Sequence, residues 1–221
     1  MKLFVAIPAY DYSISVETAR SLLNEQAVFS LAGHDLTIAF VPGCSLITMA
    51  RNQLVSDFVK SDCDKIAFVD ADISWEPGAL LKLASHPVSV VGGAYRYKKP
   101  IEEYPVLWNT DPELWAVNGL LKVDGLPGGF LCIARDALEA FEVFHGDRGY
   151  EHQGHSAYAY FTAPFRDGKL YGEDSAFCAD YRAASGKVWL DPELTLTHHA
   201  PGQAFKGNLG DWLRARMKAA A

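Results

Sequence analysis

Short apolar runs and longer amphipathic segments alternate along the first 95 residues. Helical spacing of apolar positions occupies residues 15–32, with Ser13 or Ser15 as the cap and Gly33 as the stop, and residues 48–60. A short helix is expected to open at Ser74, Glu76 and Pro77. Four apolar runs are predicted strands: KLFVAIP (2–8), DLTIAFV (35–41), KIAFVDA (65–71) and VSVVGGAY (88–95). This β-α-β-α-β-α-β order predicts an α/β domain with a parallel-type sheet.

The second half of the chain has a different pattern. Residues 119–134 contain two extended runs around a Gly/Pro-rich connection, where antiparallel pairing is expected, and a helix follows at 135–144. Residues 146–170 are rich in Gly, His, Tyr and Phe and show little periodicity. We expect a long loop there that acts as a mobile lid. A helix over 173–185 and a strand-like segment over 187–200 complete the pattern.

The composition fits one globular protein domain. The chain has 221 residues, of which 49% are apolar, and this is enough for a single compact core. A net charge of −7 argues against a nucleic-acid partner. The four cysteines form no Cys-x-x-Cys pair, so neither a zinc cage nor a compact disulfide framework is indicated. A soluble protein in the reducing cytoplasm is expected.

Basic residues gather in two short segments whose roles the sequence leaves open. In GDWLRARMKAAA, at the C-terminal end, they predict a solvated terminal helix, and peripheral contact with a membrane is the alternative. Arg96, Lys98 and Lys99 follow the fourth predicted strand. Three charges in that position favour a solvated turn over contacts with phosphate or sugar.

Two carboxylates, Asp70 and Asp72, end the third predicted strand in the segment IAFVDADIS. In open α/β sheets the ligand crevice lies beyond the carboxyl ends of the strands. If the strand stays extended through Asp72, both carboxylates project from one face of the sheet. Together they would suit a divalent cation that also neutralises a phosphate. The alternative, that Asp72 caps the next turn, stays open for an isolated Asp-x-Asp pair.

Arg51 heads an apolar stripe on the second predicted helix, at the same angular position as Leu54, Val55 and Phe58. A helix that follows a parallel strand starts at the edge of the crevice. We therefore expect Arg51 at the rim of the ligand site, where its planar fork suits a phosphate or a base edge. An internal salt bridge to Asp70 is an equally good interpretation and is compatible with the first.

Asp174 also heads an apolar stripe on a predicted helix, as Arg51 does. It lies three, four and seven residues before Phe177, Cys178 and Tyr181. This spacing directs a carboxylate toward the inward face of the helix that begins near it. An acidic residue at a helix start also favours the helix dipole and caps free amides. The pattern alone does not choose between a functional and a capping carboxylate.

A histidine pair near the end of the chain supplies a further candidate ligand. In LTLTHHA the period of two groups Leu194, Leu196 and His198 on one face. If that face continues to the crevice, His198 can offer an imidazole to a cation held by Asp72, and His199 is the less favoured ligand. The alternative is a hydrogen-bonded histidine within the core.

Seven segments in order resemble the glycosyltransferases of the GT-A fold, particularly bacterial and viral family-two-like enzymes. The resemblance runs from Phe4 to about Asn208 and is carried by IPAYD, ARNQLV, FVDADISWEPGAL, VVGGAYRYKK, GGFLCIARDAL, GEDSAFC and THHAPGQAFKG. It implies an α/β fold, a single GT-A (Rossmann-like) domain over 1–221, with a central mixed, mostly parallel sheet flanked by helices. Residues 1–100 would be the nucleotide-binding half, 101–210 the acceptor-binding half and 211–221 a C-terminal tail.

The same resemblance implies an activity and a set of site residues. The activity is transfer of a sugar from a UDP- or GDP-type nucleotide-sugar donor to a hydroxyl of a glycan or other acceptor, with Mn2+ or Mg2+ and with inversion. The implied residues are Pro8, Tyr10 and Arg51 at the nucleotide, Asp70 at the ribose and metal, Asp72 and His198 as metal ligands, Asp174 as general base and Glu173 at acceptor hydroxyls.

Two other classes of function stand beside this one. A run of apolar residues followed by Asp-x-Asp is also typical of haloacid-dehalogenase-type phosphatases, in which Asp70 would be the nucleophile. That family normally carries the motif on its first strand, whereas two strand-helix units precede Asp70 here. A non-catalytic module that binds nucleotides or sugars is the third interpretation.

Overall fold

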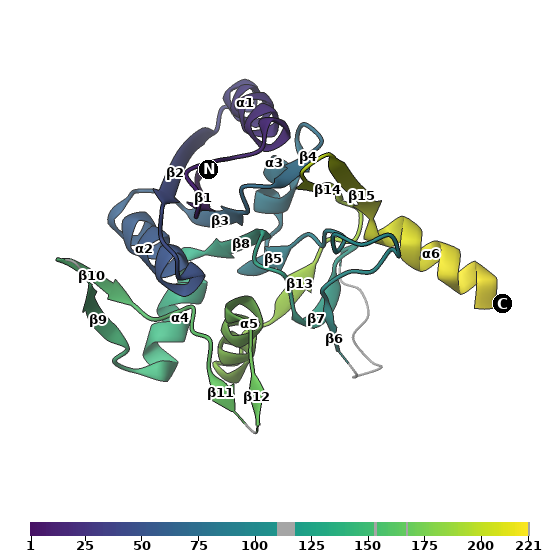
Figure 1. Ribbon diagram of the computed structural model, residues 1–221. Coiled ribbons are helices and arrows are strands. Elements are labelled where there is room, and N and C mark those ends of the chain that lie inside the picture. Colours follow the sequence, from purple (N-terminus) through teal and green to yellow (C-terminus); the bar gives the residue numbers. More distant parts are fainter. Residues whose placement is uncertain (110–117, 153, 167, 221) are drawn as a thin grey trace.

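Three layers build the fold in a computed structural model that describes residues 1–109, 118–152, 154–166 and 168–220 (Figure 1). Within these residues an eight-stranded sheet lies between two layers of helices. In spatial order its strands are β2 (Asp35–Pro42), β1 (Lys2–Ala9), β3 (Lys65–Val69), β8 (Phe130–Ala134), β5 (Val90–Gly92), β13 (Val188–Leu190), β7 (Leu121–Gly125) and β6 (Leu107–Trp108).

Both faces of the sheet are buried, because side chains alternate across each strand. Leu3, Val5 and Ile7 of β1 face the core cluster that contains Leu22, Phe29 and Leu80 of α1 (Val16–Leu31) and α3 (Ala79–Ser85). Phe4 and Ala6 face the opposite cluster, which is covered by α2 (Ile47–Lys60), α4 (Arg135–His145) and α5 (Glu173–Ala183). The predicted α/β class with helices on both sides of the sheet is confirmed.

The sheet is mixed, as predicted, because one central strand runs against its neighbours. Strand β8 lies between β3 and β5 and pairs antiparallel with both, and β7 is antiparallel to β13 and β6. The pairs β1–β2, β1–β3 and β5–β13 are parallel. The other strands of the sheet therefore share one direction, and the start of β8 lies at the same edge as the ends of β3 and β5.

The first helix starts where its predicted cap places it, whereas the short helix starts later than predicted. The side chain of Ser15 accepts a hydrogen bond from Thr18 N at 3.0 Å and caps α1. The short helix also forms, but it begins at Ala79, later than expected. The cap of this helix comes from α1 and not from its own residues. The buried carboxylate of Glu25 accepts hydrogen bonds from Gly78 N at 3.0 Å and Leu81 N at 2.8 Å.

The prediction that the third strand could stay extended through Asp72 is wrong. Strand β3 ends at Val69, and a turn closed by a hydrogen bond from Ile73 N to Asp70 O at 3.1 Å follows. The chain then enters a short strand, β4 (Ile73–Trp75). Asp70 and Asp72 thus belong to a turn between two strands, where the two-residue alternation of a strand does not apply.

The strand-like segment over 187–200 divides between two sheets. Its first part is β13, and its second part is β14 (Thr195–Ala200), which pairs with β15 (Gln203–Asn208) and with β4 in a three-stranded sheet. Asp191 starts the intervening turn, where its side chain accepts a hydrogen bond from Glu193 N at 3.0 Å. Strand β14 thereby carries the two histidines to the turn that holds Asp70 and Asp72.

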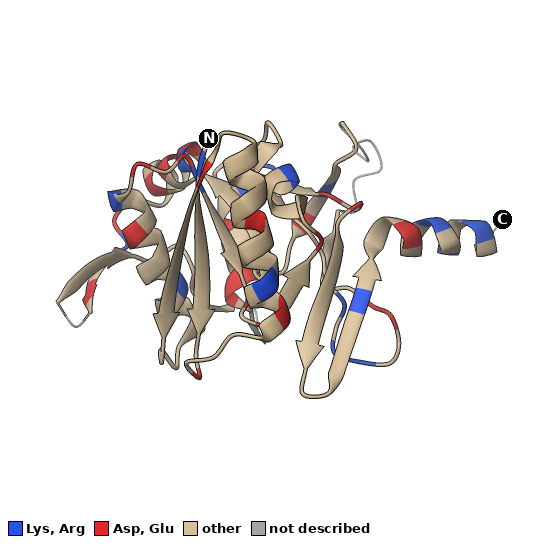
Figure 2. Cartoon of the chain, turned by 90° about the horizontal axis from the view of Figure 1, so that it is seen from above, with Lys and Arg blue, Asp and Glu red and all other residues tan. Residues whose placement is uncertain are grey.

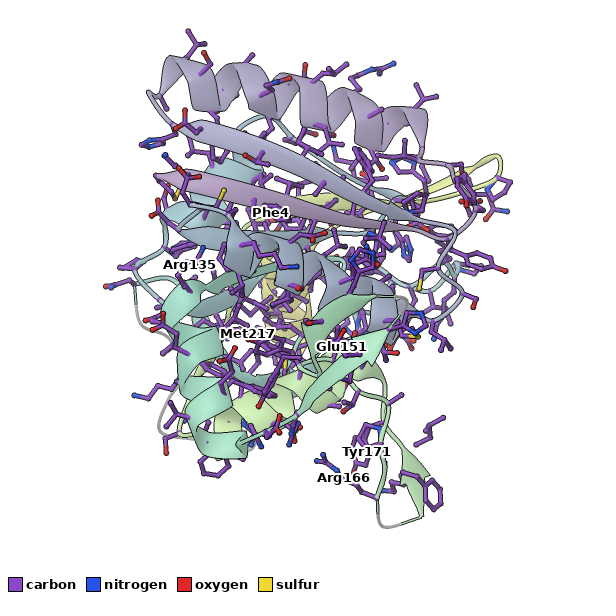
Figure 3. All side chains as sticks on the ribbon, turned by 90° about the vertical axis from the view of Figure 1, so that its left-hand side faces the viewer. Phe4, Arg135, Glu151, Arg166, Tyr171 and Met217 are labelled. Carbon is purple, nitrogen blue, oxygen red and sulfur yellow. The ribbon has the colours of Figure 1, made fainter. Side chains whose placement is uncertain are left out.

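Residues 146–170 form two hairpins in the part that the structure describes, so the prediction of a structureless loop is wrong. They are β9 (Gly149–His152) with β10 (His155–Tyr158), and β11 (Phe165–Arg166) with β12 (Lys169–Leu170). Figure 3 labels Glu151 on the first hairpin, and Arg166 and Tyr171 at the second. The buried carboxylate of Asp180 on α5 anchors this region by ion pairs with Arg148 at 2.8 Å and Arg166 at 3.1 Å. Movement as a lid stays a prediction.

The C-terminal helix α6 (Leu209–Ala220) extends away from the three layers (Figures 1 and 2). Its first turns are fixed by Trp212, whose indole nitrogen donates a hydrogen bond to Glu102 O at 3.1 Å. Two of its basic side chains already have partners, because Arg214 pairs with Glu193 and Asp211, and Arg216 lies over the ring of Trp212. Across the described residues, no helix has the length and apolar content needed to cross a membrane.

Candidate functional site

A pocket of about 1120 Å3 opens where β1 and β3 end, which is the edge that the sheet topology predicts for a ligand. It is bordered by the start of α1, by α2, by the turn after β3, by the start of α5 and by the β14–β15 hairpin. Of the predicted site residues, those that line the pocket are Pro8, Tyr10, Arg51, Asp70, Asp72, Glu173 and His198. These residues come from five separate segments of the chain, which the fold brings together at one pocket.

Arg51 is buried beneath the pocket, with 3% of its side chain exposed, and does not lie at the rim as expected. Its guanidinium donates hydrogen bonds to Asp70 at 2.9 Å, to Glu173 at 3.3 Å and to Gly128 O at 3.0 Å. It also lies over the ring of Phe68, 5.1 Å from the centroid. The predicted internal salt bridge to Asp70 is confirmed. Burial lowers the pKa of Arg51, but Asp70 and Glu173 outweigh it and the pKa is raised.

Asp70 is held on both carboxylate oxygens. Oδ1 accepts the hydrogen bond from Arg51, and Oδ2 accepts one from the hydroxyl of Tyr95 at 3.3 Å. Burial, and secondly the charge of Asp70, raises the pKa of Tyr95 well above its usual value, so this hydroxyl keeps its proton and donates. The result is a fixed carboxylate whose side chain remains 28% exposed toward the pocket.

Two adjacent glycines, Gly128 and Gly129, bring a backbone segment against these side chains just before β8. Gly129 donates from its N–H to the Tyr95 hydroxyl at 3.2 Å, and its carbonyl accepts from Asp70 N at 3.1 Å. A Cβ atom on Gly129 would lie 2.3 Å from Asp70 Oδ2, and one on Gly128 would lie 2.8 Å from Arg51 Nη2. Only glycine fits at these positions without displacing the two charged groups.

Asp72 and His198 face each other across the pocket wall, with Oδ2 and Nε2 separated by 3.6 Å. The other ring nitrogen of His198, Nδ1, lies 2.9 Å from Arg96 O. Because a carbonyl oxygen can only accept, Nδ1 carries the proton, and in the neutral imidazole Nε2 presents a lone pair toward Asp72. His199 is directed elsewhere, with Nε2 at 2.7 Å from the hydroxyl of Ser74.

The Lys98 ammonium also contacts Asp72, which corrects the expectation of a purely solvated turn. Its Nζ donates to Asp72 Oδ2 at 2.5 Å. Lys99 instead pairs with Glu103 at 2.6 Å, and Arg96 donates to backbone carbonyls such as Lys206 O. Burial works against ionisation of Asp72, but the neighbouring side chains of His198 and Lys98 outweigh it, so the pKa of Asp72 lies below its usual value.

The Asp72 and His198 pair has the chemistry of a site for Mg2+ or Mn2+. Among the described residues, no group of three or more His, Cys, Asp or Glu side chains forms a complete protein cage for a metal. Mg2+ commonly takes one or two protein ligands and completes its shell with water and substrate phosphates. Two ligand atoms that each lie about 2.1 Å from an ion are at most about 4.2 Å apart, and the separation of 3.6 Å between Oδ2 and Nε2 satisfies this. The residues present therefore fit a cation shared with a bound phosphate group.

The two acidic residues at the start of α5 have different surroundings. Glu173 lines the pocket and pairs with Arg51 at 3.3 Å. Asp174 is not among the described pocket-lining residues. Its carboxylate accepts hydrogen bonds from Gly128 N at 3.2 Å and Ser175 N at 2.6 Å, so it has the helix-capping contacts considered above. It remains partly exposed, and its role as a base stays a prediction.

The sequence interpretation did not single out Tyr95, Gly128 or Gly129. The available signals were an aromatic residue immediately after an apolar strand and a Gly-Gly pair immediately before another. Both signals are weak in isolation, because their importance depends on the pairing of β8 with β3 and β5.

Comparisons with known proteins bear on the fold. No protein-family model and no curated protein matches the chain. Among solved structures, A197 from STIV matches with a TM-score of 0.59 and 18% identity, over 94% of this chain and 95% of that one. GalNAc-T7 with UDP, GalNAc and Mn2+ matches with a TM-score of 0.51 and 10% identity, over 90% of this chain and 44% of that one. These likenesses identify the fold of the chain as GT-A-like, in agreement with the resemblance of its motifs.

Proposed function

We propose that the protein is a metal-dependent glycosyltransferase. It transfers a sugar from a UDP- or GDP-type nucleotide sugar to a hydroxyl of a glycan or other acceptor. The observation that carries the proposal is the approach of Asp72 Oδ2 to His198 Nε2, 3.6 Å apart, beside a pocket in a GT-A-like fold. The matched GalNAc-T7 structure contains UDP, GalNAc and Mn2+, which are ligands of the proposed kinds.

The donor would lie along the pocket from Tyr10 to Asp72. Tyr10 is 68% exposed beside Pro8 and offers a ring face to the nucleotide base. Asp70, fixed by Arg51 and Tyr95, is oriented to accept hydrogen bonds from ribose hydroxyls. Arg51 acts by holding this carboxylate, since each of its three side-chain nitrogen atoms already donates a hydrogen bond within the protein.

Asp72 and His198 would hold a Mn2+ or Mg2+ ion against the donor diphosphate. When bound, the ion supplies positive charge that stabilises the departing nucleoside diphosphate. Lys98 adds a further positive charge at the same wall of the pocket. The hydrogen bond from His198 to Arg96 O keeps the ring in the tautomer that leaves Nε2 free to ligate.

Asp174 is the proposed general base. A carboxylate that removes the proton of the acceptor hydroxyl as attack proceeds gives a single displacement with inversion. The hydrogen bonds that Asp174 accepts come from neutral backbone amides, which orient it and leave lone pairs available. Glu173 shares the charge of Arg51 with Asp70, and its proposed role is to hold acceptor hydroxyls at the pocket.

The decisive experiment incubates the protein and MnCl2 with a panel of UDP- and GDP-sugars and acceptors. Release of nucleoside diphosphate is followed, and UDP and GDP binding is measured by calorimetry. Asp72→Ala and His198→Ala should each remove the metal-dependent part of nucleotide binding. Asp174→Asn should retain that binding and lose transfer, while exposed Asp211→Asn serves as the matched control.

The other two classes of function give different outcomes in the same assay. A phosphatase with Asp70 as nucleophile would release inorganic phosphate from simple phosphoesters and leave nucleotide sugars intact. Both oxygens of Asp70 already accept hydrogen bonds, which disfavours that role. A non-catalytic module would bind nucleotide without release of product. Either result would overturn the proposal.

We also propose a cytoplasmic location, which the four free cysteines support, since thiols persist in a reducing compartment. Peripheral membrane contact through α6 stays a prediction. Co-sedimentation with anionic vesicles tests it, and loss of that binding on changing Arg216 and Lys218 to Ala would assign the contact to this helix. The pairing of Arg214 with Glu193 and Asp211 reduces the charge available for such a contact.

A further inference from the structure

Lys98 and His198 approach the same oxygen of Asp72. Lys98 Nζ lies 2.5 Å from Oδ2, and His198 Nε2 lies 3.6 Å from it. We propose that Lys98 and the divalent cation compete for Asp72, so that the cation binds tightly only when a donor diphosphate draws Lys98 away. This inference rests on the proposed function, and it adds an order to the binding of metal and donor.

Competition follows from the geometry around Oδ2. A cation held between Asp72 and His198 must approach the oxygen that already accepts the ammonium hydrogen bond. Two positive groups on one oxygen atom repel each other at the short distance that a shared ligand imposes. Because the Asp72 and Lys98 side chains are 38% and 37% exposed, the ion pair is partly hydrated and can open at moderate cost.

Lys98 can leave Asp72 without leaving the pocket. It lines the pocket, and its ammonium is carried on a flexible four-carbon stem that can turn without movement of the backbone. An ammonium released from Asp72 would therefore remain beside the space assigned to the diphosphate. It would then supply a point charge to phosphate oxygens, as lysines commonly do.

The charges on this wall of the pocket favour the same order of events. Asp72 and Lys98 together are neutral, so they attract a dication weakly while they are paired. A diphosphate brings negative charge that the dication and Lys98 can share. Lys98 is thus a positioning residue that couples metal binding to donor binding.

Its neighbour in the chain provides a matched control. Lys99 has a similar exposure of 49% and forms an ion pair of 2.6 Å with Glu103, away from the pocket. A change from Lys to Met at either position removes one positive charge and keeps much of the apolar stem. Only the change at position 98 removes the ammonium from Asp72.

The experiment measures Mn2+ binding by calorimetry, with and without UDP or GDP, in the wild type, Lys98→Met, Lys98→Arg and Lys99→Met. Lys98→Met should bind Mn2+ alone at least about fivefold more tightly than the wild type. The increase in Mn2+ affinity that nucleotide produces should shrink by a similar factor. Lys98→Arg should restore the weak binding of Mn2+ alone, and Lys99→Met should match the wild type. Circular dichroism checks that each variant is folded.

Equal Mn2+ affinity in the wild type and Lys98→Met, with nucleotide binding intact, would overturn the competition and leave the proposed function standing. Tighter Mn2+ binding by Lys98→Met without nucleotide binding in any protein would support competition and count against the glycosyltransferase. If no protein binds Mn2+ under any condition, both proposals fail.

Discussion

The buried carboxylate of Glu25 accepts a hydrogen bond from the indole nitrogen of Trp75 at 3.1 Å and thereby ties α1 to the end of β4. The same carboxylate caps the amides of Gly78 and Leu81. Strand β4 directly follows the turn that carries Asp70 and Asp72, so Glu25 supports that turn from outside the pocket.

Replacement of Glu25 by Ala should lower the free energy of unfolding by about 3 kcal/mol, because one buried and two partly buried donors lose their acceptor. Glu25→Gln should cost less, since one amide oxygen can still accept. Urea denaturation measures both changes. The exposed Glu139→Ala is the control, and its effect should stay within about 0.5 kcal/mol. Similar values for Glu25→Ala and Glu139→Ala would contradict the capping role.

Gly129→Ala should weaken UDP or GDP binding in the presence of Mn2+ by at least about tenfold, which corresponds to about 1.4 kcal/mol. The added Cβ would lie 2.3 Å from Asp70 Oδ2 and 2.7 Å from the Tyr95 hydroxyl, so Asp70 must move. Calorimetry of nucleotide binding tests this. Gly149→Ala is the control, because its Cβ would meet only the flexible side chain of Asp147. Unchanged affinity in Gly129→Ala would show that the position of Asp70 is unimportant.

Arg51→Lys should strongly destabilise the folded protein, although the positive charge is retained. An ammonium cannot reproduce the three directed contacts to Asp70, Glu173 and Gly128 O, and a buried charge loses partners. We expect a loss of about 3 kcal/mol in the free energy of unfolding. Thermal and urea unfolding measure it against exposed Arg20→Lys, which should be nearly neutral. A neutral Arg51→Lys would mean that charge alone suffices at this position.

Asp180 should stabilise the hairpins of residues 146–170 in a pH-dependent way. Burial raises the pKa of Asp180, but the hydrogen bonds from Arg148 and Arg166 outweigh it, so the folded-state pKa is depressed. The contribution is then fully present above the unfolded pKa of about 3.9 and is lost as the pH falls through the folded value. The stability difference between wild type and Asp180→Asn, about 2 kcal/mol at neutral pH, should shrink below about pH 4.

Urea unfolding of both proteins at several pH values between neutrality and acid tests this dependence. The control is Asp211→Asn, because Asp211 is 77% exposed and its ion pair with Arg214 lies at the surface. A difference between wild type and Asp180→Asn that stays constant into strong acid would argue against an ionised Asp180 in the folded protein.

The parts of the fold that depend on local signals are predictable from the sequence. Helix α1 begins after Ser15, as its cap indicates, and α2 follows the apolar stripe headed by Arg51. The salt bridge between Arg51 and Asp70 could also be predicted, because a buried charge at the start of an apolar helix stripe needs a partner.

The parts that depend on non-local pairing were not predictable. Strand β4 has only three residues, and its existence depends on β14, which lies far along the chain. The same pairing divides the segment 187–200 between two sheets. The roles of Tyr95 and Gly129 arise only once β8 has inserted between β3 and β5, which no local pattern encodes.

The insertion of β8 has a consequence for how the molecule is made. Strand β5 pairs with β8 and β13 and has no contact of this kind with the other strands of residues 1–100. A nascent chain that has reached residue 100 therefore carries an apolar strand whose partners are still unsynthesised. Residues 1–100 and residues 101–210 would fold together, because each half supplies strands that pair with the other. Neither half would fold on its own.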